Sequence, residues 1–231
     1  MRILALSTST EYCSAALLDG SELRERDLPP ERAAGERILE LVDALLAEAA
    51  IGLRSLDAIA FGRGPGAFTG VRLAASVTQG LAAAADLPVI AISDLQAVAQ
   101  QAFEIQDAPE RMLICQDARM REVYWAWFRM EQGIAQPASP ERVGAPASVA
   151  GLVSAGELRL SGGGGSGFDV YPELRELFSA APASVLLGLH PRAREIAWLA
   201  RHRGLKDAGR AEDAQPVYVR DQVAILPPAL T

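Results

Sequence analysis

The chain opens with Arg2-Ile-Leu-Ala-Leu-Ser-Thr-Ser-Thr-Glu-Tyr-Cys-Ser-Ala-Ala-Leu-Leu18, in which two short apolar runs flank a polar turn. Residues 2–7 and 13–18 have the composition of buried strands, and the turn between them is rich in hydroxyl side chains. This pattern predicts a β-hairpin. Asp19-Gly20 then marks a second turn, which leads towards a third strand near residues 21–28.

The same order of strand, polar turn and strand recurs in the second half of the chain. Met112–Gln116 and Val123–Met130 read as strands on either side of the polar turn Asp117–Arg121. The repeated opening predicts an α/β protein of two lobes, with mixed sheets flanked by helices. We place the first lobe at residues 1–105 and a smaller second lobe, with a C-terminal helix and an extended tail, at residues 106–231.

Apolar spacing places further elements between and after the two hairpins. Helices are predicted at residues 32–50, 71–85, 94–104 and 191–203, and strands at residues 56–61, 89–92 and 158–160. The stretch 131–151 is poor in pattern and contains three prolines, so no element is assigned there. Gly162–Gly167 is interpreted as a flexible loop rather than a nucleotide-contacting turn, because no helix pattern follows it directly.

The strongest local motif is Phe61-Gly-Arg-Gly-Pro-Gly-Ala-Phe-Thr-Gly-Val-Arg72, which joins a predicted strand to a predicted helix. Glycines allow close approach to the backbone, and the free N–H groups of the helix start favour an anion. Thr8, Ser9, Gly64 and Gly66 are therefore candidate nucleotide or anion contacts. The spacing is neither that of a P-loop nor of a dinucleotide fingerprint. A tight strand-to-helix turn without a ligand is the alternative.

Composition limits the chemistry. The chain has 231 residues, a net charge of −7, two histidines, two cysteines and a single lysine, Lys206. The histidines and cysteines lie far apart in sequence, which argues against a metal site built from them, and Lys206 lies in no phosphate-binding loop. The acidic balance gives no general attraction to nucleic acid or membranes. No signal peptide or transmembrane span is recognisable, so the cytoplasm is the expected compartment.

Five segments together resemble the TsaB (YeaZ) family of bacterial tRNA threonylcarbamoyladenosine biosynthesis proteins. They are residues 3–10, 61–72, 116–124, 191–200 and 216–220, and they extend over almost the whole chain. The 61–72 segment is the most specific, whereas the opening strand is shared with related ATPases. The resemblance implies a two-lobed fold similar to actin, Hsp70 and sugar kinases (the ribonuclease H-like fold), which agrees with the repeated hairpin.

The resemblance also implies a role as a non-catalytic partner of TsaD. TsaD moves threonylcarbamoyl from its adenylate to an adenosine of tRNA next to the anticodon, and an ATPase, TsaE, joins the system. The chain would need no cofactor of its own; ATP or threonylcarbamoyl-adenylate and a metal are implied for the assembled complex, which alone would contact tRNA. Asp94 and Val98 stand where TsaD-like proteins carry metal-binding histidines, and Ser7 stands where aspartate is more frequent.

The two helices at residues 32–50 and 71–85 are candidates for the partner interface. Their apolar residues cover a wider arc than one sheet requires, and exposed apolar strips of this kind mark interfaces. The resemblance implies that they form a four-helix bundle with TsaD, and that the chain alone uses the same surface for a homodimer. We expect Leu39, Leu46, Val71, Ala74 and Thr78 at or near this surface, although the sequence does not fix which of them face the sheet.

Two other functions compete with the partner role. A stand-alone enzyme of the same fold, either a small-molecule kinase or ATPase or a glycoprotease-like hydrolase, would need an acid near the phosphates or a metal cluster. A direct tRNA-binding module would need a basic stripe, and arginines do gather near the C-terminal helix, although such a face is more often simply solvated. These arginines are Arg192, Arg194, Arg201, Arg203 and Arg210.

Overall fold

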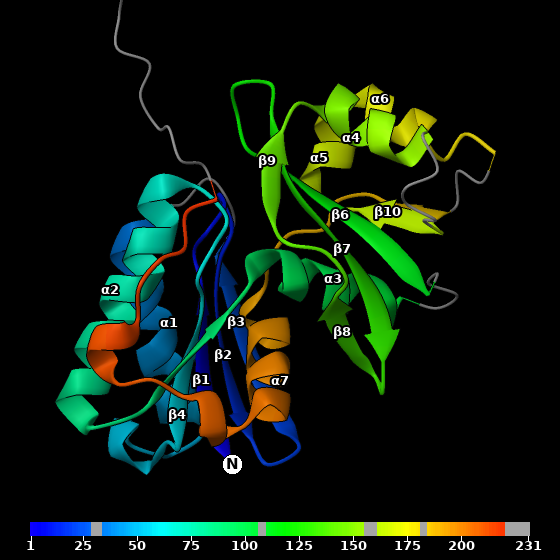
Figure 1. Cartoon of the computed structure of the whole chain (residues 1–231). Coiled ribbons are helices and arrows are strands. Elements are labelled where there is room, and N and C mark those ends of the chain that lie inside the picture. The colour runs from blue at the N-terminus through cyan, green and yellow to red at the C-terminus, as the bar shows by residue number, and fades with distance from the viewer. Residues whose placement is uncertain (29–33, 106–109, 155–160, 181–183, 220–231) are drawn as a thin grey trace, which may run out of the picture.

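The computed structural model describes residues 1–28, 34–105, 110–154, 161–180 and 184–219, which form two β-sheets with helices on their faces (Figure 1). The predicted strand at residues 158–160 lies outside these ranges. None of the helices described is long and apolar enough to cross a membrane.

The first sheet has the strand order β3-β2-β1-β4-β5. Its strands are β1 (Arg2–Ser7), β2 (Cys13–Asp19), β3 (Glu22–Leu28), β4 (Ala58–Gly62) and β5 (Val89–Ile92). The predicted hairpin is confirmed: β1 and β2 are antiparallel, with Ser7 opposite Ser14 beside the turn. β4 and β5 run parallel to β1, so the carboxyl ends of these three strands meet at one edge.

Helices cover both faces of the first sheet. On one face lie α1 (Ala34–Glu48) and α2 (Phe68–Ala85), and on the other lies α7 (Ala193–Arg203) (Figure 1). The stripe of α1 that contacts the sheet is Ile38, Leu41, Val42 and Leu45, all buried. Apolar residues three and four apart form such a stripe because an α-helix turns once every 3.6 residues.

The second sheet has the order β11-β10-β6-β7-β8, and β9 pairs with β7. Its strands are β6 (Arg111–Asp117), β7 (Val123–Glu131), β8 (Ile134–Pro137), β9 (Arg142–Gly144), β10 (Gly162–Gly164) and β11 (Val185–Leu186). The antiparallel pair β6–β7 repeats the β1–β2 hairpin, as the sequence predicted. One face is covered by α4 (Pro146–Ser154), α5 (Ser166–Val170) and α6 (Pro172–Glu176) (Figure 1).

Each sheet is also covered by a helix from the other half of the sequence. α3 (Asp94–Glu104) packs Leu95, Val98 and Ala102 against β6, β7 and β8 of the second sheet. α7, which the sequence assigned to the second lobe, packs Ile196 and Ala197 against β1 and β2 of the first sheet. An amphipathic pattern shows only that one face is buried and not which sheet covers it. The two helices also contact each other, so the lobes share one packed interior.

The C-terminal part of the described chain returns along the first lobe. Short 3₁₀ helices occur at Leu53–Ser55 (η1), Leu205–Asp207 (η3) and Ala211–Asp213 (η4). The backbone of Gly209 pairs with Val89 of β5, and Gln79 of α2 donates to the carbonyl of Ala214 at 2.9 Å. The tail therefore packs along one side of α2, next to Gln79.

Two parts of the second half differ from the prediction. The stretch 131–151, to which no element was assigned, forms the end of β7, then β8, β9 and most of α4. The predicted glycine loop is also wrong: Gly162–Gly164 forms the buried strand β10, and α5 begins at Ser166. Its glycines are needed for packing, because a Cβ on Gly163 would lie 2.3 Å from Cζ of Phe168. A strand of glycines carries no apolar pattern from which to predict it.

Gly163→Ala should lower the free energy of unfolding by about 1–3 kcal/mol, because the fully buried Phe168 ring has no space to move aside. Gly151→Ala is the matched control, since its Cβ meets nothing within 4 Å and the residue lies inside α4. Urea unfolding of both variants checks this, and equal stability of the two would contradict the packing described here.

Candidate functional site

The glycine-rich segment meets the first hairpin turn at the carboxyl ends of β1, β4 and β5. A Cβ on Gly66 would lie 2.6 Å from the carbonyl oxygen of Ser9, and one on Gly70 would lie 2.0 Å from that of Thr8. The amide of Ala67 donates to the Ser9 carbonyl at 2.7 Å. These glycines therefore let two backbones touch, and the contact requires no ligand.

Asp94 lies at the centre of this contact, at the first position of α3 and without any exposed surface. One carboxylate oxygen accepts from the Ser9 hydroxyl at 2.7 Å, and the other accepts from the Gly64 amide at 2.5 Å. Gly62 must lack a side chain, because its Cβ would lie 2.4 Å from the Asp94 carboxylate. We call Thr8, Ser9, Gly64, Gly66 and Asp94 the strand-end site.

Burial dominates the electrostatics of Asp94. Desolvation raises the pKa of its carboxyl to about 7, whereas the hydrogen bonds from Ser9 and Gly64 act in the opposite direction. The nearby Arg63 charge also lowers this pKa, and Glu141 raises it. The site therefore holds a carboxyl group that changes charge near neutral pH.

The four predicted anion contacts are close together, but donors of three of them bind the chain itself. The Ser9 hydroxyl and the Gly64 amide bind Asp94, and the Thr8 hydroxyl donates to the carbonyl of Gly70 at 2.7 Å. The Asp94 carboxylate thus occupies the place that an external anion would need in order to reach the donors of Ser9 and Gly64. The family resemblance singled out Asp94 only because it stands where TsaD-like proteins have a histidine, and it did not predict the hydrogen bonds from Ser9 and Gly64.

A polar clamp links this site to the second lobe. Both terminal nitrogens of Arg63 bind the Glu141 carboxylate at 3.1 Å, and Ser93 donates to the same carboxylate. Ser93 also caps α3 by accepting from the Gln96 amide at 3.1 Å. Glu141 lies in the stretch without pattern, between β8 and β9, so no signal in the sequence pointed to it.

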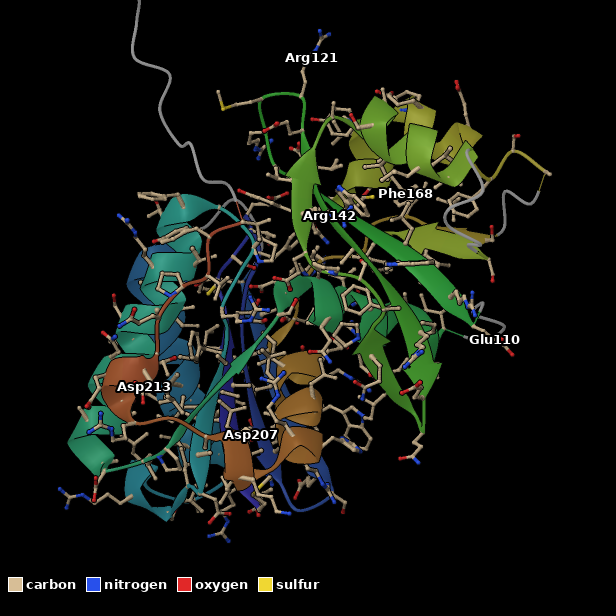
Figure 2. All side chains as sticks on the ribbon, viewed as in Figure 1. Glu110, Arg121, Arg142, Phe168, Asp207 and Asp213 are labelled. Carbon is tan, nitrogen blue, oxygen red and sulfur yellow. The ribbon has the colours of Figure 1, made fainter. Side chains whose placement is uncertain are left out.

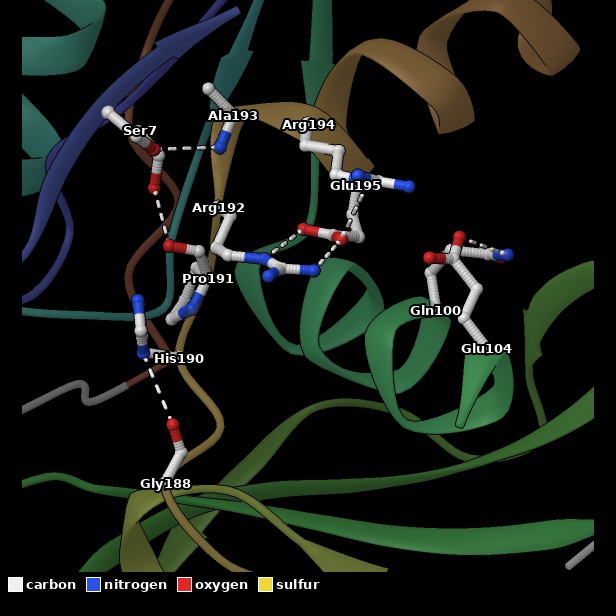
Figure 3. A network of polar contacts seen from close by, with 11 residues as sticks. Ser7, Gln100, Glu104, Gly188, His190, Pro191, Arg192, Ala193, Arg194 and Glu195 are labelled. Atoms are coloured by element: carbon white, nitrogen blue, oxygen red, sulfur yellow. Dashed lines mark hydrogen bonds and ion pairs between the residues drawn. The ribbon is translucent and has the colours of Figure 1, made fainter. Parts of the chain in front are cut away.

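Ser7 joins the end of β1 to the segment that leads into α7. Its buried hydroxyl donates to the carbonyl of Pro191 at 3.1 Å (Figure 3). The preceding residue, His190, stacks on the Tyr12 ring with 3.7 Å between ring centroids, and burial lowers the pKa of this imidazole. Both contacts position α7 on the first sheet.

A small cavity of about 130 Å³ lies between the two hairpin turns. Ser9 and Thr10 line it from the first turn, and Gln116 and Asp117 line it from the second. Asp117 already accepts from the Tyr171 hydroxyl at 3.0 Å and pairs with Arg119 at 3.2 Å. A larger groove of about 700 Å³ lies elsewhere, between Gln96, Ile134 and Leu199, and neither hairpin turn lines it.

The positions of the metal-binding histidines of relatives lie in the interior. Asp94 and Val98 are both fully buried on α3. Within the described ranges, no group of three or more histidine, cysteine, aspartate or glutamate side chains is placed to hold a metal ion.

Three of the five predicted interface residues are buried. Val71, Ala74 and Thr78 of α2 are at most 1% exposed, so they are not part of the exposed surface of this helix, and their place at a partner interface stays a prediction. Leu39 is 49% exposed, and Leu46 is half-buried against the core. The exposed side of α1 and α2 carries Leu39, four alanines (Ala44, Ala47, Ala83 and Ala84) and Gly80, together with the charged or polar residues Glu40, Asp43, Glu48, Arg72 and Ser76. The sequence did not define which residues of α2 are buried, because this helix is apolar nearly all round.

The arginines near α7 mostly have contacts within the chain. Arg192 pairs with the buried Glu195 (Figure 3), and Arg210 pairs with Glu212 at 2.7 Å. Arg201 and Arg203 donate to backbone carbonyls of the first sheet and its turn. Arg194 lies 3.8 Å from the Glu195 carboxylate. Arg201 and Arg203 thus help to hold α7 on the first sheet.

Similarities to known proteins agree with this architecture. A family model described as TsaD, tRNA N6-adenosine threonylcarbamoyltransferase, matches residues 29–223. The tRNA threonylcarbamoyladenosine biosynthesis protein TsaB of Escherichia coli is 38% identical over 97% of this chain and 96% of that protein. TsaB of Haemophilus influenzae is 52% identical, over 54% of this chain and about half (53%) of that protein.

The structure of YeaZ from Pseudomonas aeruginosa is 40% identical, with a TM-score of 0.80 over 94% of this chain and 99% of that one. A second structure from that organism, with similarity to peptidase YeaZ, gives a TM-score of 0.82 at 40% identity and covers 95% and 99% of the two chains. The chain therefore belongs to the TsaB (YeaZ) family, within the TsaD-related group of the actin/Hsp70/sugar-kinase-like superfamily.

Proposed function

We propose that the chain acts in tRNA threonylcarbamoyladenosine biosynthesis as a non-catalytic partner subunit that TsaD requires for threonylcarbamoyl transfer. The full-length similarity to the Escherichia coli protein of that pathway supports the pathway. The observation that carries the partner role is the internal closure of the strand-end site, where Asp94 takes the donors of Ser9 and Gly64. Because its own carboxylate fills the strand-end site, we infer that the subunit acts by binding its partner and not by catalysing a reaction.

The exposed side of α1 and α2 is the proposed docking face. Leu39 is the large apolar side chain that α1 exposes, and the exposed alanines and Gly80 of the two helices let a second helix approach closely. In the proposed complex these helices pack on TsaD, and the same face forms a homodimer when TsaD is absent. Docking biases TsaD towards a competent arrangement through contacts that differ between its states.

The remaining components belong to the assembled complex. TsaE binds that complex, and ATP or threonylcarbamoyl-adenylate and a metal are held there, not by this chain alone. The tRNA is reached only through the complex, because the arginines of α7 are engaged within the chain. A stand-alone kinase, ATPase or hydrolase of this fold would need an acid free to position a metal or a water. Asp94 and Asp117 already have partners at these positions.

Reconstitution of tRNA modification tests the proposed function directly. Purified TsaD, TsaE, the adenylate-forming enzyme, threonine, bicarbonate and ATP should modify tRNA only when this chain is added. The chain incubated without TsaD should give no modified tRNA. Turnover by the chain without TsaD, or full turnover in its absence, would each overturn the partner role.

Leu39→Glu tests the docking face. A charge in the middle of an apolar helix contact should weaken the complex with TsaD by at least roughly 30-fold, the effect of losing a central apolar anchor. The fold should be unaffected, because the side chain is half exposed. Leu187→Glu is the matched control, since Leu187 is 52% exposed on the other lobe. Binding measured by biolayer interferometry checks this, and equal affinities of the two variants would exclude α1 from the interface.

Asp94→Asn tests whether the carboxyl group with the raised pKa stabilises the fold or takes part in catalysis. Its pKa of about 7 lies above the ordinary value of 3.8, so the folded state binds the proton more tightly than the unfolded state. This contribution to the free energy of unfolding is therefore full below about pH 4, falls as the pH rises towards 7, and is lost above it. Asparagine does not titrate, so the variant should lack this pH dependence of the free energy of unfolding. Relative to the wild type it should gain stability between pH 4 and pH 8, and it should retain tRNA modification.

The control for this variant is Asp86→Asn, at an exposed left-handed helix end that asparagine tolerates. Glu25 and Glu195 also have raised pKa values, so the difference between the wild-type and variant curves isolates Asp94. Loss of tRNA modification with stability and TsaD binding intact would make Asp94 a catalytic acid and contradict the partner role.

A further inference from the structure

Four large apolar side chains form a solvent-exposed cluster at the end of α2 nearest the second lobe. Met120 is 66% exposed, Phe68 46%, Tyr218 45% and Val217 41%. They come from the β6–β7 turn, the first residue of α2 and the C-terminal tail, and they line one cavity of about 320 Å³. We call these four residues the Met120 patch. An exposed apolar cluster assembled from separate segments is typical of an interaction site.

The turn that carries Met120 has an unfavourable backbone conformation. Arg119, Met120 and Arg121 have φ values of 61°, 54° and 62°, so three consecutive non-glycine residues have a left-handed backbone conformation. Each such residue brings its Cβ too close to the backbone, and a succession of them is rare. Hydrogen bonds across the turn hold it, from Ala118 N to Glu122 O at 2.9 Å and from Glu122 N to Arg119 O at 3.0 Å. Backbone strain is retained mainly where function uses it.

Positive charge surrounds the Met120 patch. The Arg72 guanidinium lies 3.6 Å from the centroid of the Phe68 ring and donates to the Tyr218 hydroxyl at 2.7 Å. Arg121 extends outward from the tip of the turn (Figure 2). Within the part of the chain that the structure describes, neither Arg72 nor Arg121 forms an ion pair with a carboxylate. In a chain of net charge −7, this local excess favours a ligand that carries a carboxylate.

The patch is continuous with the proposed docking face, because Phe68 and Arg72 begin a row of exposed α2 residues that runs through Ser76 to Gly80. A protein that packs along α1 and α2 reaches the patch without leaving the surface of this helix. Methionine suits such a contact, since its flexible thioether adapts to the shape of an inserted side chain.

We propose that the Met120 patch is a second docking surface for the same protein partner, and that it receives a segment with an apolar side chain next to a carboxylate. The apolar side chain enters the cavity between Phe68, Met120 and Tyr218, and the carboxylate binds Arg72 or Arg121. This inference rests on the proposed function, because it assigns the occupant to the partner of α1 and α2.

Met120→Gly separates binding from folding. Glycine adopts the left-handed conformation without strain, so the melting temperature should rise by about 2–6 °C. The same change removes the apolar contact, so the affinity for purified TsaD should fall about 10-fold. Gln132→Gly is the matched control, because Gln132 is also exposed and left-handed, with φ 51°, in the β7–β8 turn. It should raise the melting temperature without changing the affinity.

Arg121→Glu tests the charged part of the contact. It should lower the affinity for TsaD at low salt and remove part of the salt dependence that the wild-type protein shows. Unchanged affinity of both Met120→Gly and Arg121→Glu, with Leu39→Glu still weakening the complex, would overturn this inference and leave the proposed function standing. No effect of Leu39→Glu either would exclude α1 from the interface and would also overturn this inference, whereas the reconstitution experiment alone decides the proposed function. Loss of tRNA binding by the complex with TsaD affinity intact would assign the patch to RNA and also overturn the inference.

Discussion

The buried carboxylate of Asp94 organises the centre of the molecule. A charged or titratable group without access to water must find hydrogen-bond donors, and here the donors come from two segments that are distant in sequence. The Ser9 turn and the Gly64 loop are therefore fixed against the start of α3. Gly62 leaves space for the carboxylate, and the neighbouring Ser93 continues the contact to Glu141 and Arg63. These connected hydrogen bonds and the ion pair thus hold the first sheet, α3 and the second lobe in fixed positions relative to one another.

This arrangement explains how the fold serves the proposed role. The hydroxyl turn and the glycine-rich helix start are both present, yet their groups satisfy one another. The molecule consequently has a rigid centre without any ligand, and its adaptable surfaces lie at the periphery. The exposed side of α1 and α2 includes several alanines beside charged residues, and the Met120 patch adds aromatic and flexible side chains at the start of α2. A partner subunit benefits from such a division, because a preorganised surface loses less freedom on binding.

The sequence predicted those parts of the fold in which apolar residues recur at the regular spacing of a strand or a helix. Both hairpins and the helices α1, α2 and α3 have apolar spacing that matches their geometry, and the structure has them at nearly the predicted residues. Orientation was less predictable: Val71, Ala74 and Thr78 lie on a helix that is apolar on several sides, so only the packed sheet defines its inner face. β10 was missed because glycines have no pattern, and its identity as a strand comes from its neighbours β6 and β11.

The strand-end site was predicted only in part, for a related reason. The residues that meet there are local motifs, which the sequence displays, whereas the bonds among them join positions 85 and 30 residues apart. Asp94 stood out by comparison with relatives, but nothing in its neighbours indicated that Ser9 and Gly64 would bind it. Glu141 had no distinguishing neighbourhood at all, since an exposed-looking acid in a proline-containing stretch is ordinary. Long-range polar contacts of this kind are a property of the assembled fold.

The exchange of α3 and α7 between the two sheets has a consequence for synthesis on the ribosome. The strands of the first sheet are complete once β5 has been made, but the face that α7 covers stays bare until residues 193–203 emerge. Ile3, Ala5 and Ile90 on that face are fully buried in the finished protein and would meet water until then. The newly made first lobe is therefore an aggregation-prone intermediate until α7 has been made or a chaperone shields it. Closure of this core depends on a helix that is synthesised long after the strands it covers.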